Sequence, residues 1–546
     1  MLRAILTRMS DGYALPEYPF VRPPELDGGG PGRHPLVIVG AGLAGLTLAC
    51  DLATRGVRAL VLDDDHTVGV RGASSRGIVY VQKTLEVMAR LGTFERMAAK
   101  GVRWSVGRVL AGEDELYRFD ALKQSHGLQP PFVNLQQFYV EWFLVDRIVE
   151  LGLTELRWQS QVVGVEIAAD GVRLEVETPA GRYALVADWV VDAEGVNSFI
   201  RQHLKLAEHT ERTPDRWCIT DVRFEGTLPD ERWTWAEAPF NEGRAVWQHR
   251  MADDVWRLDF QMAPDSDPAW VSREDVARER VARMLGPETR FELVWVGPYA
   301  YRTMLMERFR HGRLLFVGDA AHAKSPFGAR GGNSGVHDAD NLGWKLALLL
   351  AGRADERILD AYDLERHRAA EENIRTTARS GRFLRPRSEA EFTLRRAVLG
   401  LAREHAFARA LVDTGRLCTP HDYAGLSTIG PGGAAGCAIA NVALGGRHAS
   451  LIDWLRAGPE PVAFVFAAPE AAGEQALQSV AARWPLRAAW LGRDFDDPTG
   501  ELAALTGVPV GGVALLRPDA HLAATLPNAA PGPLADALAR TFGIIP

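Results

Sequence analysis

The sequence lacks the features that mark secreted, metal-binding and membrane-spanning proteins. Four cysteines (Cys50, Cys218, Cys418 and Cys437) are scattered without a C-x-x-C pair, so disulfides, a thiolate metal site and a redox dithiol are not expected. No apolar run has membrane-spanning length, and the N-terminal residues have no continuous hydrophobic region of a cleaved signal. Neither H-E-x-x-H nor a G-x-S-x-G elbow appears. We therefore expect a cytoplasmic protein with no metal.

The chain also lacks an excess of basic residues. Its net charge is −8, which is not the footprint of a nucleic-acid-binding protein. The 47% hydrophobic and 24% charged residues are typical of a globular protein. A length of 546 residues is enough for about two to four domains with several cores.

The first motif lies between two apolar segments. Residues 36–39 read as a strand, a G-x-G-x-x-G turn follows, and a helical stretch leads to a second strand that ends in an acid. The glycines allow a tight turn, close approach of a pyrophosphate and close helix packing, and the acid has the spacing of a ribose contact. This order predicts a dinucleotide site but does not separate NAD from FAD. Its candidate residues are Gly40, Gly42, Leu43, Ala44, Gly45 and Asp63.

The second motif, residues 318–346, follows another apolar strand at 314–317. Asp319 at the strand end can accept hydrogen bonds from sugar-like hydroxyls. The Gly-rich loop lets backbone approach a flat ligand. A helix expected to begin at 333–335 offers free N–H groups to a developing negative charge, which a reduced flavin carries at N1 and O2.

Residues 216–300 are rich in tryptophan and alternate like strands. A sheet with aromatic residues on one face suits a flat apolar ligand, although core packing accounts for most of them. Trp247 and His249 are candidate pocket residues. His249 and Tyr80 can each accept a proton from a phenol, with packing or solvation as the alternative.

Two further residues are candidates for a place near the cofactor. Arg76 in the loop before a helix either reaches a cofactor phosphate or forms a surface ion pair. Glu194, in a strand–turn–helix segment that ends near Arg201, is expected near the junction of cofactor and substrate regions.

The pattern predicts an α/β protein with a Rossmann-like FAD-binding domain, a β-sheet substrate domain and a C-terminal α/β unit. Residues 436–546 contain alternating strand and helix patterns without redox cysteines. The expected divisions are an irregular arm at 1–34, FAD-binding segments at 35–215 and 301–385, a substrate sheet at 216–300 with a contribution from 102–132, a helical connector at 386–435, and the tail unit at 436–546.

Together these motifs resemble the single-component FAD-dependent aromatic hydroxylases, such as p-hydroxybenzoate, phenol and 3-(3-hydroxyphenyl)propionate hydroxylases. The resemblance covers about residues 35–385, and it implies a thioredoxin-like fold for the tail. It gives cofactor roles to the dinucleotide residues above and to Arg76, Gln137, Glu194, Gly318, Asp319, Pro326, Gly331, Gly332 and Asn333. The family usually has Glu where Asp63 stands, and Asp where Glu194 stands.

The loop departs from the family at Arg330, which is expected to add a cation close to the isoalloxazine. Pro326 matches a proline whose carbonyl lies near the reactive flavin edge. The candidate catalytic residues are Pro326, Arg330, His249 and Tyr80, and the candidate substrate contacts are Trp247, His249 and Phe327.

The resemblance implies hydroxylation of a phenol or small aromatic acid by O2, with NADH or NADPH as reductant, through a flavin C4a-hydroperoxide. The sequence leaves two alternatives open: oxygenation of a larger natural product or antibiotic, and a non-catalytic FAD-bound binding protein. Dimers are common in the family, so a homodimer is compatible with the resemblance.

Overall fold

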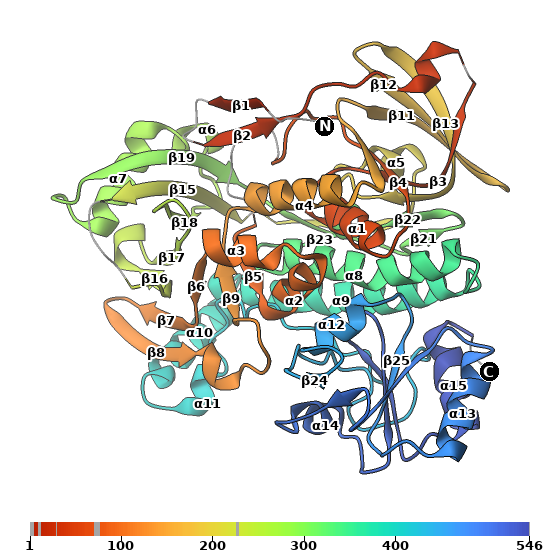
Figure 1. The fold of residues 1–546 in the computed structure, drawn as a ribbon. Helices are drawn as coiled ribbons and strands as arrows, with labels where there is room; N and C mark the ends of the chain where they lie inside the picture. Colours follow the sequence, from red (N-terminus) through yellow and green to blue (C-terminus); the bar gives the residue numbers. More distant parts are fainter. Residues whose placement is uncertain are drawn as a thin grey trace.

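The computed structural model describes residues 5–8, 13–28, 30–69, 77–213, 215–224 and 229–544. Two sheet-based units lie side by side, and a C-terminal unit lies below them (Figure 1). Two long helices, α8 (Arg330–Leu350) and α9 (Ile358–Leu384), run through the middle of the molecule.

An eight-stranded sheet forms the first unit. Its main order is β10-β4-β3-β13-β12-β11, and off this path β22 pairs with β13 and β21 pairs with β22. Its central strands pair in parallel, and residues 36–39 are almost fully buried, as expected for strands covered on both faces. The strands are β3 (Gly32–Val39), β4 (Ala59–Leu62), β10 (Thr154–Arg157), β11 (Gln161–Ala168), β12 (Gly171–Thr178), β13 (Gly181–Asp192), β21 (Arg310–His311) and β22 (Leu314–Phe316).

The parallel strands end at one level of this sheet. Val39 pairs with Leu62 and Asp192, and Asp192 pairs with Phe316. The segments that follow these strands therefore meet at one edge, where ligands bind in open α/β sheets. The helices beside this unit are α1 (Leu43–Thr54), α2 (Gln82–Leu91), α3 (Phe94–Lys100), α4 (Gln137–Leu151) and α5 (Phe199–His203).

The second unit is a seven-stranded sheet with the order β19-β15-β18-β17-β16-β7-β8. Residues 106–120 supply its last two strands, and the rest come from residues 216–299. Its strands are β7 (Val106–Ala111), β8 (Asp114–Asp120), β15 (Arg216–Phe224), β16 (Arg232–Ala238), β17 (Arg244–Arg250), β18 (Trp256–Met262) and β19 (Phe291–Tyr299). Two helices, α6 (Pro268–Val271) and α7 (Glu274–Leu285), contact β19.

Small sheets join the two units. One contains β5 (Val79–Val81), β9 (Phe132–Asn134) and β6 (Val102–Trp104), and the other contains β14 (Glu208–Arg212), β20 (Arg302–Met306) and β23 (His322–Ala323).

The N-terminal arm is more regular than the sequence predicts. Strands β1 (Ile5–Arg8) and β2 (Ala14–Glu17) form a hairpin, and β3 already begins at Gly32. The aromatic residues of the arm pack onto the body, since the Tyr18 ring stacks on Trp158 with centroids 4.5 Å apart. A second arm residue, Tyr13, packs against Phe138 with ring centroids 4.9 Å apart, so residues 13–18 are held against the first unit.

The C-terminal unit has a four-stranded sheet in the order β26-β25-β28-β29. Strands and helices alternate along most of the unit, as the sequence pattern predicts, whereas the strands at 513–516 and 522–526 follow each other directly. Its elements are α12 (Leu451–Arg456), β25 (Val462–Val465), α13 (Ala471–Ala481), β26 (Arg487–Trp490), α14 (Glu501–Thr506), β28 (Val513–Leu516), β29 (Leu522–Leu526) and α15 (Pro531–Thr541), with β24 (Gly445–Gly446) and β27 (Phe495–Asp496) paired apart from the sheet. Before it lie α10 (Glu389–Ala402) and α11 (Ala406–Arg409).

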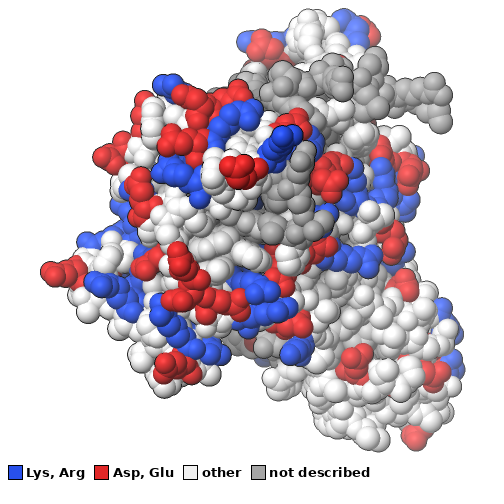
Figure 2. Space-filling view, turned by 90° about the vertical axis from the view of Figure 1, so that its left-hand side faces the viewer, with Lys and Arg blue, Asp and Glu red and all other residues white. Residues whose placement is uncertain are grey.

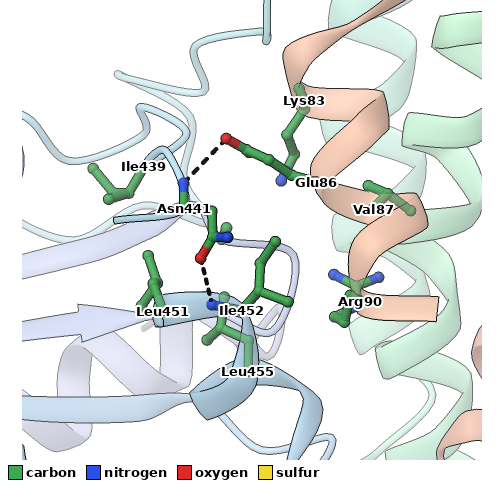
Figure 3. Close-up of a pocket in the computed structure, with 10 residues that line it drawn as sticks. Lys83, Glu86, Val87, Arg90, Ile439, Asn441, Leu451, Ile452 and Leu455 are labelled. Atoms are coloured by element: carbon green, nitrogen blue, oxygen red, sulfur yellow. Dashed lines mark hydrogen bonds between the residues drawn. The ribbon is translucent and has the colours of Figure 1, made fainter. Parts of the chain in front are cut away.

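The C-terminal unit is fastened to α2 by polar contacts. The Glu86 carboxylate accepts a hydrogen bond from the Asn441 backbone N–H at 3.0 Å, and the Asn441 side-chain oxygen accepts one from the Ile452 N–H at 2.9 Å (Figure 3). Acidic and basic residues are interspersed over the side of the molecule that carries the seven-stranded sheet (Figure 2). None of the helices in the described ranges has the length and hydropathy of a membrane span.

Candidate active site

The glycine turn between β3 and α1 has the geometry that its sequence predicts. Gly40 has φ +107°, and a Cβ there would lie 2.5 Å from the Ala193 carbonyl oxygen. A Cβ on Gly45 would lie 2.0 Å from the Gly40 oxygen, so both positions require glycine. A Cβ on Gly42, in contrast, would meet nothing within 4 Å. Gly42 therefore leaves the start of α1 open, with the N–H groups of Leu43 and Ala44 available to an anion.

Asp63 closes this turn from the neighbouring strand. One carboxylate oxygen accepts a hydrogen bond from the Ala41 N–H at 2.5 Å, and the other accepts one from the Asp65 N–H at 2.9 Å. Burial raises the pKa of this carboxyl to about 7. The side chain thus orders the turn, in addition to the ribose contact expected from its spacing.

Glu194 lies two residues after β13 and contacts the first turn of α5, whose N-cap residue is Ser198. Its carboxylate accepts a hydrogen bond from the Ile200 N–H at 3.1 Å, and its own N–H donates to Asp192 at 2.9 Å. Burial and the neighbouring Asp192 raise the pKa of Glu194 to about 8. The nearby Arg201 is buried and donates to the Ala320 carbonyl at 2.6 Å, so this segment supports the loop that follows β22.

We call residues 318–329 the Gly-Asp loop. Gly318 has φ +60°, and its N–H donates to the buried Asp338 at 2.9 Å. The Asp319 side chain is exposed, whereas Gly318 and Ala320 on either side are buried. The loop therefore holds one carboxylate outward at the same sheet edge as Gly42.

The Gly-Asp loop turns into α8 through two hydrogen-bonded residues. The Pro326 carbonyl accepts a hydrogen bond from Ala329, which has a left-handed φ of 55°, and α8 begins at Arg330 rather than at residues 333–335. Asn333 accepts from Val81 N–H at 3.2 Å and donates to the Val79 carbonyl at 2.8 Å. Asn333 thus clamps β5 to the helix start.

Gly331 and Gly332 lie in the first turn of α8. A Cβ on Gly331 would meet nothing within 4 Å, and one on Gly332 would lie 3.1 Å from Leu43 of α1. The starts of α1 and α8 therefore lie close together, and both present backbone N–H groups.

Arg330 points away from the helix start. Its guanidinium donates to the Asn373 side chain of α9 at 2.7 Å and to the Arg416 carbonyl at 3.1 Å. The arginine is buried, so its charge remains inside the protein. Its two hydrogen bonds connect the Gly-Asp loop to α9 and to the segment at Arg416.

Gln137 and Tyr80 lie on the other side of this edge. The Gln137 side-chain oxygen accepts from the Gly77 N–H at 3.0 Å, and its amide donates to Glu141 at 2.8 Å. Tyr80 on β5 is buried, and burial raises the pKa of its hydroxyl well above the ordinary value. Arg76 lies outside the described residues.

Four aromatic rings join the Gly-Asp loop to the seven-stranded sheet. Trp217 and Trp247 stack with centroids 4.5 Å apart, and Phe327 contacts both edge-on at 5.9 and 5.5 Å. The Tyr301 ring lies 5.7 Å from Phe327. We call these four residues the aromatic cluster.

The acid that orders this cluster was missed in the sequence analysis. Buried Asp215 accepts hydrogen bonds from the Trp217 indole at 3.0 Å and from the Tyr301 hydroxyl at 2.9 Å. An acid two residues before a tryptophan in an expected strand is the only local signal that could have pointed to it.

His249 lies on β17 beside Trp247. Its Nε2 atom is 4.0 Å from Asp259, and burial and the charges of Arg232 and Arg257 lower its pKa well below the ordinary value. The imidazole is therefore neutral at pH 7.

Residues 33–377 match the sequence profile of the family described as "FAD binding domain". This match covers more than half of the chain. The chain belongs to this FAD-binding family.

The relatives of this FAD-binding protein agree with its resemblance to the aromatic hydroxylases. A 3-(3-hydroxy-phenyl)propionate/3-hydroxycinnamic acid hydroxylase of Mycobacterium avium is 27% identical over 64% of this chain and 61% of its own length. The chain thus aligns with less than two thirds of that relative. A 6-methylpretetramide 4-monooxygenase of Streptomyces rimosus is 29% identical over 92% of this chain and 91% of its own.

The solved structure of the flavin-dependent monooxygenase PieE, described with FAD and substrate, has the same fold. Its TM-score is 0.79, with 22% identity over 94% of this chain and 99% of its own.

The residues at the sheet edge fit FAD. Gly42 and Gly331 leave open space where a side chain would stand, so the backbone can approach a cofactor at both helix starts. The N–H groups of Leu43 and Ala44 suit the pyrophosphate, and the exposed Asp319 carboxylate suits the ribityl hydroxyls. The start of α8 suits the electron-rich pyrimidine side of the flavin.

Proposed function

We propose that the protein is a FAD-dependent monooxygenase that hydroxylates a phenolic aromatic compound, with NADH or NADPH as reductant and O2 as the oxygen source. The packing of Phe327 against Trp217 and Trp247 carries this proposal. It brings the loop beside the cofactor edge into contact with an aromatic surface of the other sheet. A flat substrate bound there lies between cofactor and sheet.

The cofactor supplies the redox and oxygen chemistry when it is bound, and the chain positions the reactants and excludes water. Asn333 of α8 holds the loop from Pro326 to Ala329 by a 2.6 Å hydrogen bond to the Ala329 carbonyl, and the aromatic cluster packs against Phe327 from the side of the sheet. Buried aromatic surface around the substrate protects a reactive site from solvent.

The two proton-transfer candidates differ in their ionisation. A depressed pKa keeps His249 neutral at pH 7, so one ring nitrogen is able to accept a phenolic proton. A raised pKa keeps Tyr80 protonated, so its hydroxyl acts as a hydrogen-bond donor rather than as a base. We therefore assign His249 the role of hydrogen-bond acceptor for a phenolic hydroxyl, since the low pKa that keeps its imidazole neutral also makes it a weak base, and we assign Tyr80 that of a donor.

Oxygenation of a larger natural product is the second candidate. The alignment with the 6-methylpretetramide monooxygenase spans both chains almost completely, whereas that with the hydroxyphenylpropionate hydroxylase stops short of two thirds of either. This difference favours a substrate larger than a simple phenolic acid.

The test is NADH and NADPH oxidation by the FAD-loaded protein with phenols, phenolic acids and polycyclic phenols, with product mass followed. We expect one phenol to accelerate oxidation and to gain one oxygen atom. Acceleration with hydrogen peroxide alone identifies a compound that triggers reduction without being hydroxylated. FAD that neither nucleotide reduces with any compound would refute the proposal in favour of a binding protein.

A further inference from the structure

Three buried nitrogen atoms on the seven-stranded sheet have no hydrogen-bond partner among the described residues. They are Nε of Arg232, Nε1 of Trp247 and Nδ1 of His249. Each side chain is at most 7% exposed. Unsatisfied buried polar atoms are rare in folded proteins because each costs free energy, so three on neighbouring residues call for an explanation.

The three side chains share one face of the sheet. Trp247 and His249 are two residues apart on β17 and so point the same way. Trp247 pairs with Thr234 of β16, and the same register places Arg232 opposite His249. The Arg232 guanidinium carbon lies 5.9 Å from the centroid of the Trp247 ring.

This face of the sheet is directed toward the Gly-Asp loop. The Trp247 ring contacts Phe327 of the Gly-Asp loop at 5.5 Å. Val246, which precedes Trp247 and therefore points to the opposite face, packs in a different cluster, with Phe260 and with Val281 of α7. The unpartnered nitrogens therefore lie on the substrate side of the sheet.

Arg232 brings an unbalanced positive charge to this face. Across the part of the chain that the structure describes, no carboxylate forms an ion pair with its guanidinium. Asp259 and the Tyr117 hydroxyl act on it from a distance, but Asp259 already accepts a 2.9 Å hydrogen bond from Arg257. Burial lowers the pKa of Arg232 to about 10, which still leaves the group charged at neutral pH. A buried cation without a counter-ion is costly to the fold.

We propose that Arg232, Trp247 and His249 form a recognition site for an oxyanion of the aromatic substrate, either a phenolate or a carboxylate. Arg232 supplies the charge and an N–H donor, and the Trp247 indole supplies a second donor. His249 donates or accepts at Nδ1 according to its tautomer. The site rests on the proposed function in one respect, because it takes its ligand to be the aromatic substrate.

The test is titration of the FAD-loaded protein with matched acidic and neutral compounds, followed by the flavin absorbance. One pair is p-nitrophenol and p-nitroanisole, and the other is m-hydroxybenzoate and m-hydroxybenzamide. We expect wild-type protein to prefer the acidic member of at least one pair. The first pair reports a phenolate and the second a carboxylate.

The decisive variant is Arg232→Met. It should raise the Kd of the preferred acidic compound by about tenfold or more, the loss expected for a charge-assisted hydrogen bond, and leave the neutral partner within about twofold. Arg232→Lys should recover part of the loss. Arg250→Met is the control, since Arg250 lies on the opposite face of β17, where it pairs with Asp230 and Asp254. Equal losses for acidic and neutral compounds, or no acidic preference in the wild type, would overturn the proposal.

Thermal unfolding provides a readout that needs neither substrate nor turnover. A buried charge that serves binding destabilises the folded protein, so Arg232→Met should unfold at the wild-type temperature or above it. A clear fall in Tm would assign Arg232 a structural role and contradict the site. Both readouts remain decisive even if no oxygenated product is ever found, which separates this proposal from the proposed function.

Discussion

Arg517 and Glu365 form a pair of parallel hydrogen bonds in the interior, at 2.7 and 2.8 Å, between the C-terminal unit and α9. Both side chains are fully buried. Glu365 also accepts a hydrogen bond from Lys345 of α8 at 2.8 Å, and Arg517 also pairs with Asp519. The C-terminal unit is therefore joined to the helices beside the cofactor edge by charges that have no access to water.

Removing the charge of Glu365 should destabilise the whole protein. Glu365→Gln leaves Arg517 and Lys345 without their shared counter-ion, and breaking one side of a buried ion pair costs roughly 3–5 kcal/mol. Equilibrium unfolding in urea measures this change. The control is Asp275→Asn, which breaks the exposed pair with Arg273 and should have little effect. A small effect of both substitutions would mean that the C-terminal unit is held mainly by its apolar contacts.

Asp319 should contribute to FAD affinity without contributing to stability. Its exposed carboxylate has the position of a ribityl contact, so Asp319→Ala should weaken FAD binding by about tenfold to a hundredfold, the range for hydrogen bonds to a charged group. Equilibrium dialysis of the FAD-free protein measures it, with exposed Asp265→Ala as the control. Undiminished affinity would contradict the placement of Asp319 at the cofactor.

The cofactor edge could be anticipated from sequence because its signals are local. Glycines 40, 42 and 45 follow one strand directly, and Asp319 follows another, so strand order alone brings them together. The substrate side could not be anticipated, since the register of the adjacent strands β16 and β17 sets Arg232 beside Trp247, and Phe327 reaches them from a distant loop only through ring packing. Arg330 shows the same limit of sequence analysis. Its position in the motif can be predicted from sequence, but its contacts with the distant Asn373 and Arg416 cannot.

Arg330 and Asn373 offer a way to separate charge from loop positioning. Arg330→Met removes the cation and both contacts, and it should leave FAD bound but slow NAD(P)H oxidation in the presence of substrate. Asn373→Ala removes one partner and retains the cation. If the field of the cation matters, only the arginine variant will be slow in stopped-flow measurements of flavin reduction. Similar slowing of both variants would assign Arg330 to loop positioning, and unchanged rates would place it outside the flavin's influence.

Lys324 should make the free energy of unfolding depend on pH in the alkaline range. This buried lysine lies in the Gly-Asp loop, where its ammonium is 2.8 Å from His322 Nδ1, and burial lowers its pKa to about 8. Because the unfolded lysine titrates near pH 10.4, the unfolded state binds more protons between these values. The free energy of unfolding should therefore rise as pH increases from about 8 to about 10 through this group.

Lys324→Met removes that titration. The difference in unfolding free energy, wild type minus variant, should increase over this pH range by about 2–3 kcal/mol, since each unit of pKa shift corresponds to about 1.4 kcal/mol. Urea unfolding at several pH values measures it. Lys123→Met is the control, because Lys123 is exposed and its removal should leave the pH dependence unchanged. A constant difference between wild type and Lys324→Met across this range would show that Lys324 titrates in the folded protein as it does in water.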